Sequence, residues 1–253
     1  MTDLAHSILG HGDPFMWAHG LTSSRSNEDA GGIFDRTPVT QRGRQVVRYD
    51  ARGHGQTGGP TDAAAYHWSQ LAVDLLVLLD DLDIGCTSAG GASMGCATLL
   101  HAALQAPERF DRLVLVIPPT AWDTRAGQAE QYEASARYIE TAGKAAWLAV
   151  ASEAPRAAIF ADLPPFPSTA DIPEELLPFV LRGAAASDLP APGDISMITQ
   201  PTLVLAWAGD PGHPVSTAER LVELLPDAEL RVAAKIGHVL GWPEQVAAFL
   251  DTP

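Results

Sequence analysis

The chain has 253 residues, enough to bury one full hydrophobic core, and its 46% hydrophobic and 19% charged residues are ordinary for a globular protein. A formal net charge of −15 and a pI near 4.7 argue against nucleic acid or an anionic membrane as a partner. No apolar run approaches the roughly 18 residues of a membrane span, and residues 1–4 lack the basic start of a secretory signal. Because only two cysteines occur, Cys86 and Cys96, we expect a reduced, cytoplasmic protein.

Strand-like and helical patterns alternate from the start of the chain. Residues 4–9 form a short extended run before a glycine-rich turn, and residues 15–18 and 45–49 predict two further strands. Over residues 66–82, leucines recur at helical spacing and predict an amphipathic helix.

The stretch that organises the chain is a single G-x-S-x-G formed by Gly91, Ser93 and Gly95. A short run suited to a buried strand precedes it at residues 86–89, and residues 97–104 read as a helix. A strand, a sharp turn with serine at its apex and a helix make a nucleophile elbow, in which glycines let the strand and the helix pass closely. The free N–H groups at the start of such a helix point at the reacting oxygen.

The second half of the chain continues the alternation after one long interruption. Residues 112–117, 201–207 and 230–233 predict buried strands, and residues 215–225 and 243–250 predict the helices beside them. The whole pattern indicates an α/β fold with a mostly parallel sheet and helices on both faces. Between two of these strands lie helical fragments at 132–139 and 145–150 and proline-rich joints at 164–167 and 190–192. We therefore expect residues 1–119 and 199–253 to form the core and residues 120–198 to form a helical cap.

Two residues past the elbow could assist a serine nucleophile. A serine hydroxyl reacts poorly near neutral pH and needs an adjacent base that is itself oriented by an acid. Asp210 follows the strand at 201–207, and His238 follows the strand at 230–233. Both therefore come just after the carboxyl end of a strand, where open α/β sheets bind ligands.

Five segments now stand in a recognisable order. They are His19-Gly20, Asp50-x-Arg52-Gly53-x-Gly55, the Ser93 elbow, Asp210-x-x-x-Pro214, and His238 with Pro243-Glu244. In these segments the chain resembles the α/β-hydrolase-fold superfamily, in its capped esterase, lactonase and C–C-hydrolase type. The resemblance implies Ser93 as nucleophile, His238 as general base and acid, and Asp210 as the carboxylate that orients it.

The same resemblance implies an oxyanion hole made by the backbone N–H groups of Leu21 and Met94. Because the N-terminal segment is short, we expect the first of the superfamily's usual eight strands to be missing. His19 is expected to fix the oxyanion loop by hydrogen bonding, and His54 to fix a neighbouring turn.

Some roles have a second candidate. Asp123, shortly past the strand that ends at residue 117, is the alternative acid. His213 lies close enough to Asp210 in sequence to form a metal pair, but no third ligand is spaced to join them, so we predict no metal site. For the substrate pocket we expect Trp122, Trp147, Val215 and Val239, although aromatic residues at helical spacing also suit a core.

These features favour a serine hydrolase that cleaves a small, largely apolar carboxylic ester or lactone through an acyl-enzyme on Ser93. The same site also suits C–C bond hydrolysis or cofactor-free haloperoxidase or perhydrolase chemistry, and the fold could serve as a ligand-binding module without turnover. No phosphate-binding motif follows Gly95, so no cofactor is expected. The expected partner is a small-molecule substrate, and the sequence leaves open whether the chain forms a homo-oligomer.

Overall fold

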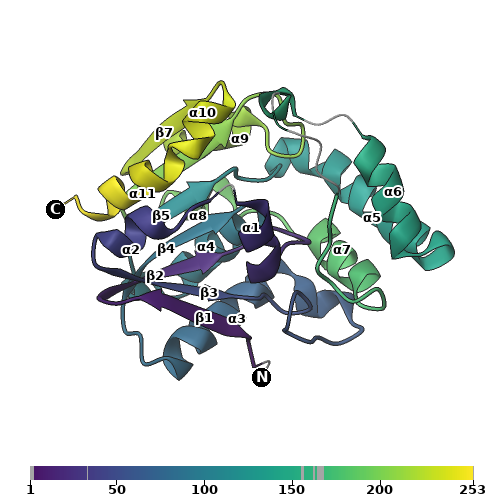
Figure 1. The fold of residues 1–253 in the computed structure, drawn as a ribbon, viewed down its shortest axis with the longest axis horizontal. Coiled ribbons are helices and arrows are strands. Elements are labelled where there is room, and N and C mark those ends of the chain that lie inside the picture. The colour runs from purple at the N-terminus through teal and green to yellow at the C-terminus, as the bar shows by residue number, and fades with distance from the viewer. Residues whose placement is uncertain (1–2, 33, 155–156, 162, 164–167, 253) are drawn as a thin grey trace.

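The structure is a computed structural model that describes residues 3–32, 34–154, 157–161, 163 and 168–252. The proline-rich joint predicted at 164–167 lies outside the described residues. A seven-stranded sheet runs through the centre of the molecule in the order β1-β3-β2-β4-β5-β6-β7 (Figure 1). The strands are β1 His6–Gly10, β2 Asp13–Ala18, β3 Arg44–Tyr49, β4 Thr87–Ala92, β5 Phe110–Val116, β6 Thr202–Trp207 and β7 Ala228–Ala233. The edge strand β1 is antiparallel to β3, and every other pairing is parallel.

The α/β fold predicted from the sequence is confirmed, and the seven described strands agree with the expectation of one strand fewer than eight. Helices cover both faces of the sheet (Figure 1). The longer helices of this core are α3 Trp68–Asp81, α4 Met94–Gln105, α9 Val215–Leu224 and α11 Trp242–Leu250, and the short ones are α1 Arg25–Gly31, α2 Thr37–Gln41, α8 Pro192–Ile195 and α10 Ile236–Leu240.

Alternation along the strands divides the buried side chains into two cores. On β2, Met16 and Ala18 join the core that lies under α3, α4 and α9, whereas Phe15 and Trp17 join the core under α2 and α11. Successive side chains of a strand point to opposite faces, so a strand covered on both sides must be apolar at nearly every position. Strand β6 meets this requirement, since all six of its residues are buried.

Strand β4 is rich in small residues because large rings already occupy the space beside it. A Cβ added at Gly90 would lie 2.6 Å from Cζ of Phe15 and within 3.0 Å of the Trp17 ring. The β4 sequence Thr-Ser-Ala-Gly-Gly-Ala therefore suits a central strand that pairs with β2 and β5, although it lacks branched apolar residues.

Between β5 and β6 the described residues form helices and no strand. The helices are α5 Arg125–Ala142, α6 Lys144–Glu153, α7 Leu177–Ala185 and the short α8. In Figure 1, α5, α6 and α7 gather at one side of the sheet, and a separate core cluster that includes Ile139, Ile172 and Leu177 holds them together. No helix in the described part of the chain is long and apolar enough to cross a membrane.

The glycines of the elbow are required by close backbone packing. A Cβ on Gly95, in the first turn of α4, would lie 2.2 Å from the carbonyl oxygen of Ala18 on β2. A Cβ on Gly91 would lie 2.6 Å from the carbonyl carbon of Gly95. Three backbones therefore meet here at distances that exclude any side chain, and this contact positions the residue between the two glycines.

We predict that Gly95→Ala lowers the free energy of unfolding by about 2 kcal/mol or more, because a methyl group cannot fit without moving β2 or α4. The matched control is Gly127→Ala on α5, where nothing lies within 4 Å of an added Cβ. That change should be neutral or stabilising by up to about 1 kcal/mol, since alanine favours a helix more than glycine does. Chemical denaturation of the two variants measures both effects, and equal stabilities would contradict the packing argument.

Candidate active site

Ser93 lies at the carboxyl end of β4, immediately before α4 begins. Its backbone is held at φ 51° and ψ −110°, outside the regions that residues with a side chain normally adopt. A hydrogen bond from its N–H to the carbonyl oxygen of Val116, at 3.0 Å, ties this conformation to the neighbouring strand. Strained backbone of this kind persists only where the surrounding structure enforces it, and it concentrates at functional sites. Of the five described non-glycine residues with positive φ, three (Thr22, Ser93 and Ile117) line the cavities described below.

Asp210 and His213 are brought together by one tight turn after β6. The N–H of His213 donates to the carbonyl oxygen of Asp210 at 3.2 Å, and the N–H of Gly212 donates to Oδ1 of the same aspartate at 2.9 Å. These are the hydrogen bonds of a β-turn with an aspartate at its first position, and proline and glycine occupy its two central positions. The first and last side chains of such a turn lie close together.

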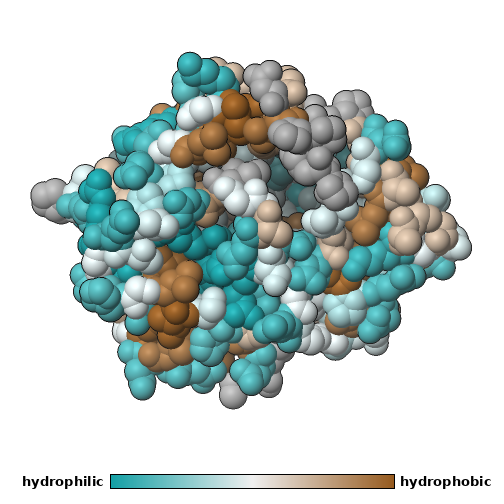
Figure 2. Space-filling model, in the orientation of Figure 1, coloured by the Kyte–Doolittle hydropathy of each residue, from teal (hydrophilic) through white to brown (hydrophobic). Residues whose placement is uncertain are grey.

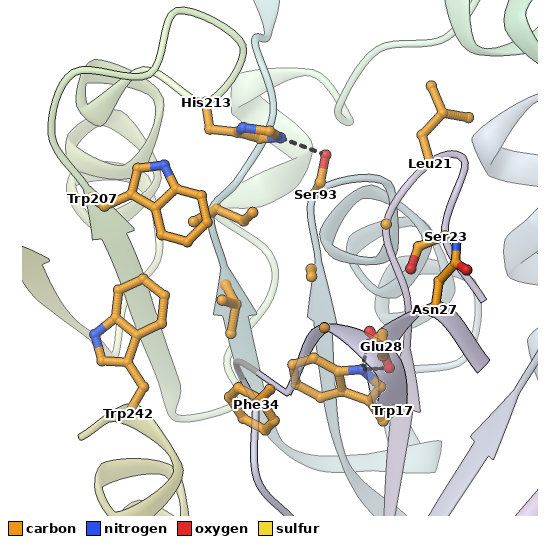
Figure 3. A pocket seen from close by; sticks show the side chains of 15 residues that line it. Trp17, Leu21, Ser23, Asn27, Glu28, Phe34, Ser93, Trp207, His213 and Trp242 are labelled. Atoms are coloured by element: carbon orange, nitrogen blue, oxygen red, sulfur yellow. Dashed lines mark hydrogen bonds between the residues drawn. The ribbon is translucent and has the colours of Figure 1, made fainter. Parts of the chain in front are cut away.

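The side chains of these residues form a continuous hydrogen-bonded chain to Ser93. Nδ1 of His213 lies 2.8 Å from Oδ2 of Asp210. Nε2 of the same ring lies 2.8 Å from Oγ of Ser93, and a dashed line marks this second contact in Figure 3. An ionised carboxylate only accepts, so Nδ1 carries the proton and Nε2 is free to accept the proton of the serine hydroxyl. This arrangement is that of a nucleophile, a base and an orienting acid.

The carboxylate of Asp210 is strongly held in its ionised form. Besides the histidine, the indole Nε1–H of Trp207 donates to Oδ2 at 3.0 Å. Burial alone would favour the neutral carboxyl, but the hydrogen bonds from His213, Trp207 and Gly212 outweigh it and lower the pKa of Asp210 to about 2. Asp210 is therefore a charged acceptor at neutral pH.

The histidine beside the serine is not the one expected from the sequence. His238 lies on α10 with an exposed side chain, and Ala234 N–H lies 3.4 Å from its Nδ1. Val239, the next residue, is completely buried and Ile236 packs on the same core, so helical geometry turns His238 away from that face. The prediction that His238 contacts Ser93 and Asp210 is wrong for this structure, and His213 takes that place.

The residues whose backbone N–H groups the resemblance assigns to an oxyanion hole, Leu21 and Met94, lie near Ser93. Met94 is the first residue of α4, where an amide has no partner within the helix. Leu21 follows Gly20, whose Cα lies close enough to Ser93 that an added Cβ would be 3.5 Å from the serine Cβ. In the described part of the chain, neither Leu21 N–H nor Met94 N–H has a hydrogen-bond acceptor.

His19 fixes the loop that carries Leu21. Its buried ring bonds the carbonyl oxygen of Gly20 through Nδ1 at 2.8 Å, and its Nε2 accepts the N–H of Ala51 at 2.9 Å. The predicted hydrogen-bonding role of His19 is confirmed. His54 bonds the carbonyl oxygen of Arg52 in the neighbouring turn, as expected, and burial beside His19 lowers its pKa to about 3, which keeps this ring neutral.

One cavity of about 330 Å³ descends from Ser93 into the core (Figure 3). Four large aromatic side chains line it, those of Trp17, Phe34, Trp207 and Trp242. Ser23, Asn27 and Glu28 of the α1 region form the side opposite Trp207 and Trp242 (Figure 3).

A second cavity of about 650 Å³ lies between the core and the helices α5 and α6, and it shares Leu21, Ser93 and His213 with the first. Figure 2 shows that this face of the molecule is hollowed between the core elements and those helices. Among the residues expected to line a substrate pocket, Trp147 lines this second cavity, together with Tyr132 and Tyr138.

The remaining pocket predictions are not supported by the geometry. Val239 is fully buried in the core, so its prediction as a pocket residue is wrong. Trp122 and Val215 pack against the core under α3, α4 and α9 and line neither cavity, and Trp122 donates its indole N–H to the carbonyl oxygen of Pro190. The side chains of Trp122 and Val215 therefore contribute to packing against this core.

The structure also locates Asp123, the alternative acid, and the Asp210–His213 pair considered for a metal. Asp123 is exposed in a short 3-10 helix, and the carboxylate that meets a histidine beside Ser93 is that of Asp210. Over the residues that the structure describes, no group of three histidine, cysteine or acidic side chains is placed to hold a metal ion. His213 bonds both Asp210 and Ser93, one through each ring nitrogen.

Comparison with known proteins agrees with this fold. A family model described as the alpha/beta hydrolase fold matches residues 13–135. A 3-oxoadipate enol-lactonase of Acinetobacter baylyi is 31% identical over 216 residues, which are 81% of this chain and 75% of that protein. A pimeloyl-[acyl-carrier protein] methyl ester esterase of Nitrosomonas europaea is 28% identical over 99% of both chains. The crystal structure of an enol-lactonase from Burkholderia xenovorans matches with a TM-score of 0.79 at 23% identity, over 99% of this chain and 97% of that one.

The chain therefore belongs to the α/β hydrolase family, and the resemblance read from its motifs is confirmed. It is a hydrolytic enzyme.

We predict that the lowered pKa of Asp210 makes stability depend on pH. A carboxyl whose pKa is lower in the folded state stabilises that state above its unfolded pKa, and the contribution disappears as pH falls through the folded pKa. The difference in free energy of unfolding between the wild type and Asp210→Asn should therefore shift in favour of the variant as pH falls from the ordinary value of 3.8 to about 2. Denaturant titrations over this range measure it, and a difference that stays constant or shifts the other way would contradict the hydrogen-bond network.

Proposed function

We propose that this protein is a serine hydrolase that cleaves a carboxylic ester or lactone through an acyl-enzyme on Ser93. The observation that carries the proposal is the chain of hydrogen bonds from Ser93 Oγ through the His213 ring to the Asp210 carboxylate, at 2.8 Å for each step. This chain stands beside two backbone amides that have no acceptor in the described part of the molecule.

The chemistry follows from these positions. His213 Nε2 takes the proton of Ser93 as Oγ attacks the substrate carbonyl, and the oxygen that becomes negative is stabilised by Leu21 N–H and Met94 N–H. The protonated imidazole, held in place by Asp210, then gives its proton to the leaving alcohol as the C–O bond breaks. A water molecule, deprotonated by the same ring, attacks the acyl-enzyme and releases the carboxylic acid and the free serine.

We infer a small, largely uncharged substrate. Apart from Glu28 and the catalytic His213, the described residues that line the first cavity carry no ionisable side chain, and its walls are mainly apolar. The net charge of −15 disfavours polyanionic substrates. Two relatives act on related carbonyl groups by name, one as an enol-lactonase and one as a methyl ester esterase, which supports an ester or a lactone here.

We further infer that residues 120–198 act as a cap that influences specificity. The helices α5 and α6 of this segment line the second cavity beside Ser93 and His213, through residues such as Tyr132 and Trp147. A group bound in that cavity would contact the cap directly, so changes on these helices should alter substrate preference more than they alter the chemical step.

We predict that Ser93→Ala lowers kcat on an activated ester such as p-nitrophenyl acetate by about 10⁴ or more, because the members of such a triad act as a unit. Labelling by a fluorophosphonate should disappear in the same variant. The matched control is Ser23→Ala, which removes another hydroxyl from the wall of the same cavity and should leave labelling and turnover close to wild type. Phosphonylation of a residue other than Ser93, or substantial turnover by Ser93→Ala, would contradict the proposal.

A second prediction separates the two histidines. His213→Ala should lower kcat by about 10⁴, whereas His238→Ala, a change at an exposed side chain, should keep activity within a factor of about two. Parallel kinetics on the same ester, with melting temperatures as the check on folding, decide the matter. The reverse pattern would assign the base to His238 and make the Ser93–His213 contact catalytically irrelevant.

A further inference from the structure

The first cavity is walled by two stacked pairs of aromatic rings. Trp17 and Phe34 stack with centroids 4.4 Å apart and an interplanar angle of 21°, and they form the end of the cavity farthest from Ser93 (Figure 3). Trp207 and Trp242 stack almost in parallel, 5.7 Å apart at 5°, along one side (Figure 3). Flat rings on two sides favour the binding of a flat substrate group, because aromatic groups stabilise one another in offset-stacked and edge-to-face contacts.

The charges around this cavity disfavour an anionic guest. Glu28 lines the wall, and its carboxylate accepts the indole N–H of Trp17 at 2.8 Å and pairs with Arg36. The guanidinium of Arg36 lies 5.9 Å from the centroid of the Trp17 ring and 6.0 Å from that of Phe34, and it does not line the cavity. Among the described lining residues there is no lysine or arginine to receive a carboxylate on the substrate.

The position of the cavity indicates which part of the substrate enters it. Its walls come from core elements, the ends of β2, β4, β5 and β6 with α1 and α11, whereas the second cavity lies under α5 and α6. In the proposed reaction the acyl group stays on Ser93 while the alcohol departs and water enters. The aromatic cavity in the core therefore suits the acyl group, and the cavity under the cap suits the leaving group.

We propose that the cavity lined by Trp17, Phe34, Trp207 and Trp242 binds an uncharged aryl-substituted acyl group, such as phenylacetyl. The inference rests on the proposed ester hydrolysis and names the substrate class of that site. The size agrees, because an apolar cavity of about 150 Å³ already holds benzene, and this one has about 330 Å³. The additional space accommodates the short link from the ring to the carbonyl carbon on Ser93.

The test compares p-nitrophenyl phenylacetate with p-nitrophenyl octanoate, which share the leaving group and have acyl groups of eight carbons. Each kcat/KM is divided by the hydroxide-catalysed rate of the same ester to remove intrinsic reactivity. We expect the wild-type enzyme to favour phenylacetate by about tenfold, as two or three aromatic contacts provide. A preference for octanoate, or no preference, would overturn the inference without any variant.

Two variants test which of the two cavities produces the preference for phenylacetate. Phe34→Leu removes one ring from the aromatic cavity without touching the Ser93–His213–Asp210 chain, and it should reduce the phenylacetate preference about fivefold. Tyr138→Leu removes a ring from the second cavity and should leave the preference unchanged. A loss of preference in Tyr138→Leu but not in Phe34→Leu would place the acyl group under the cap and overturn the assignment.

Hydrolysis of p-nitrophenyl acetate, measured in the wild type and in Ser93→Ala, separates the two proposals, because the acetyl group carries no ring. If acetate is cleaved in a Ser93-dependent way but phenylacetate is not preferred, the acyl-site inference fails while the hydrolase proposal stands. If no ester is cleaved at all, both fail.

Discussion

The contact on which the site depends is the close approach of three backbones at the elbow. The first turn of α4 passes so near β2 that any side chain at Gly95 would overlap the carbonyl oxygen of Ala18. That contact leaves the chain between Gly91 and Gly95 little freedom, and it holds Ser93 at a positive φ that an isolated residue would avoid. The strain is balanced by the packing of α4, in which nine of twelve residues are buried. Met94 is the first residue of this helix, and its amide has no hydrogen-bond acceptor in the described part of the chain.

The turn at Asp210–His213 gives the site a second property, because the acid and the base of the proposed triad belong to one short loop. Their relative position depends on the turn itself rather than on the docking of distant elements. Trp207 links this loop to the cavity, since its indole N–H binds Asp210 while its ring stacks on Trp242 in the cavity wall. We therefore expect a substrate group that moves these rings to shift the Asp210 carboxylate as well, and with it the His213 ring that it holds.

Much of the fold could be predicted because buried parallel strands need apolar residues at nearly every position. The runs at 112–117 and 201–207 coincide with β5 and β6 to within about two residues. Ser93 and Asp210 could be placed for a similar reason, since both follow strands whose carboxyl ends share one edge of the sheet. The sequence points to His238 rather than to His213 as the neighbour of Ser93, because sequence order does not show which face of α10 is buried, and the burial of Val239 decides that. The sequence signal for His213 is Asp-Pro-Gly-His, a β-turn sequence that brings its first and fourth residues together.

The aromatic cavity could not be predicted from the sequence. Its four aromatic residues, Trp17, Phe34, Trp207 and Trp242, are far apart in the chain and meet only in the folded molecule.

The central claim is that Ser93 is the nucleophile and that His213 and Asp210 activate it. A crystal structure of the protein after reaction with a small alkyl fluorophosphonate tests this claim most directly. The account predicts phosphorus bonded to Ser93 Oγ, the phosphoryl oxygen facing the N–H groups of Leu21 and Met94, and the His213 ring beside the adduct with Asp210 at its Nδ1. An adduct on another residue, or the ring of His238 in place of His213, would contradict the account.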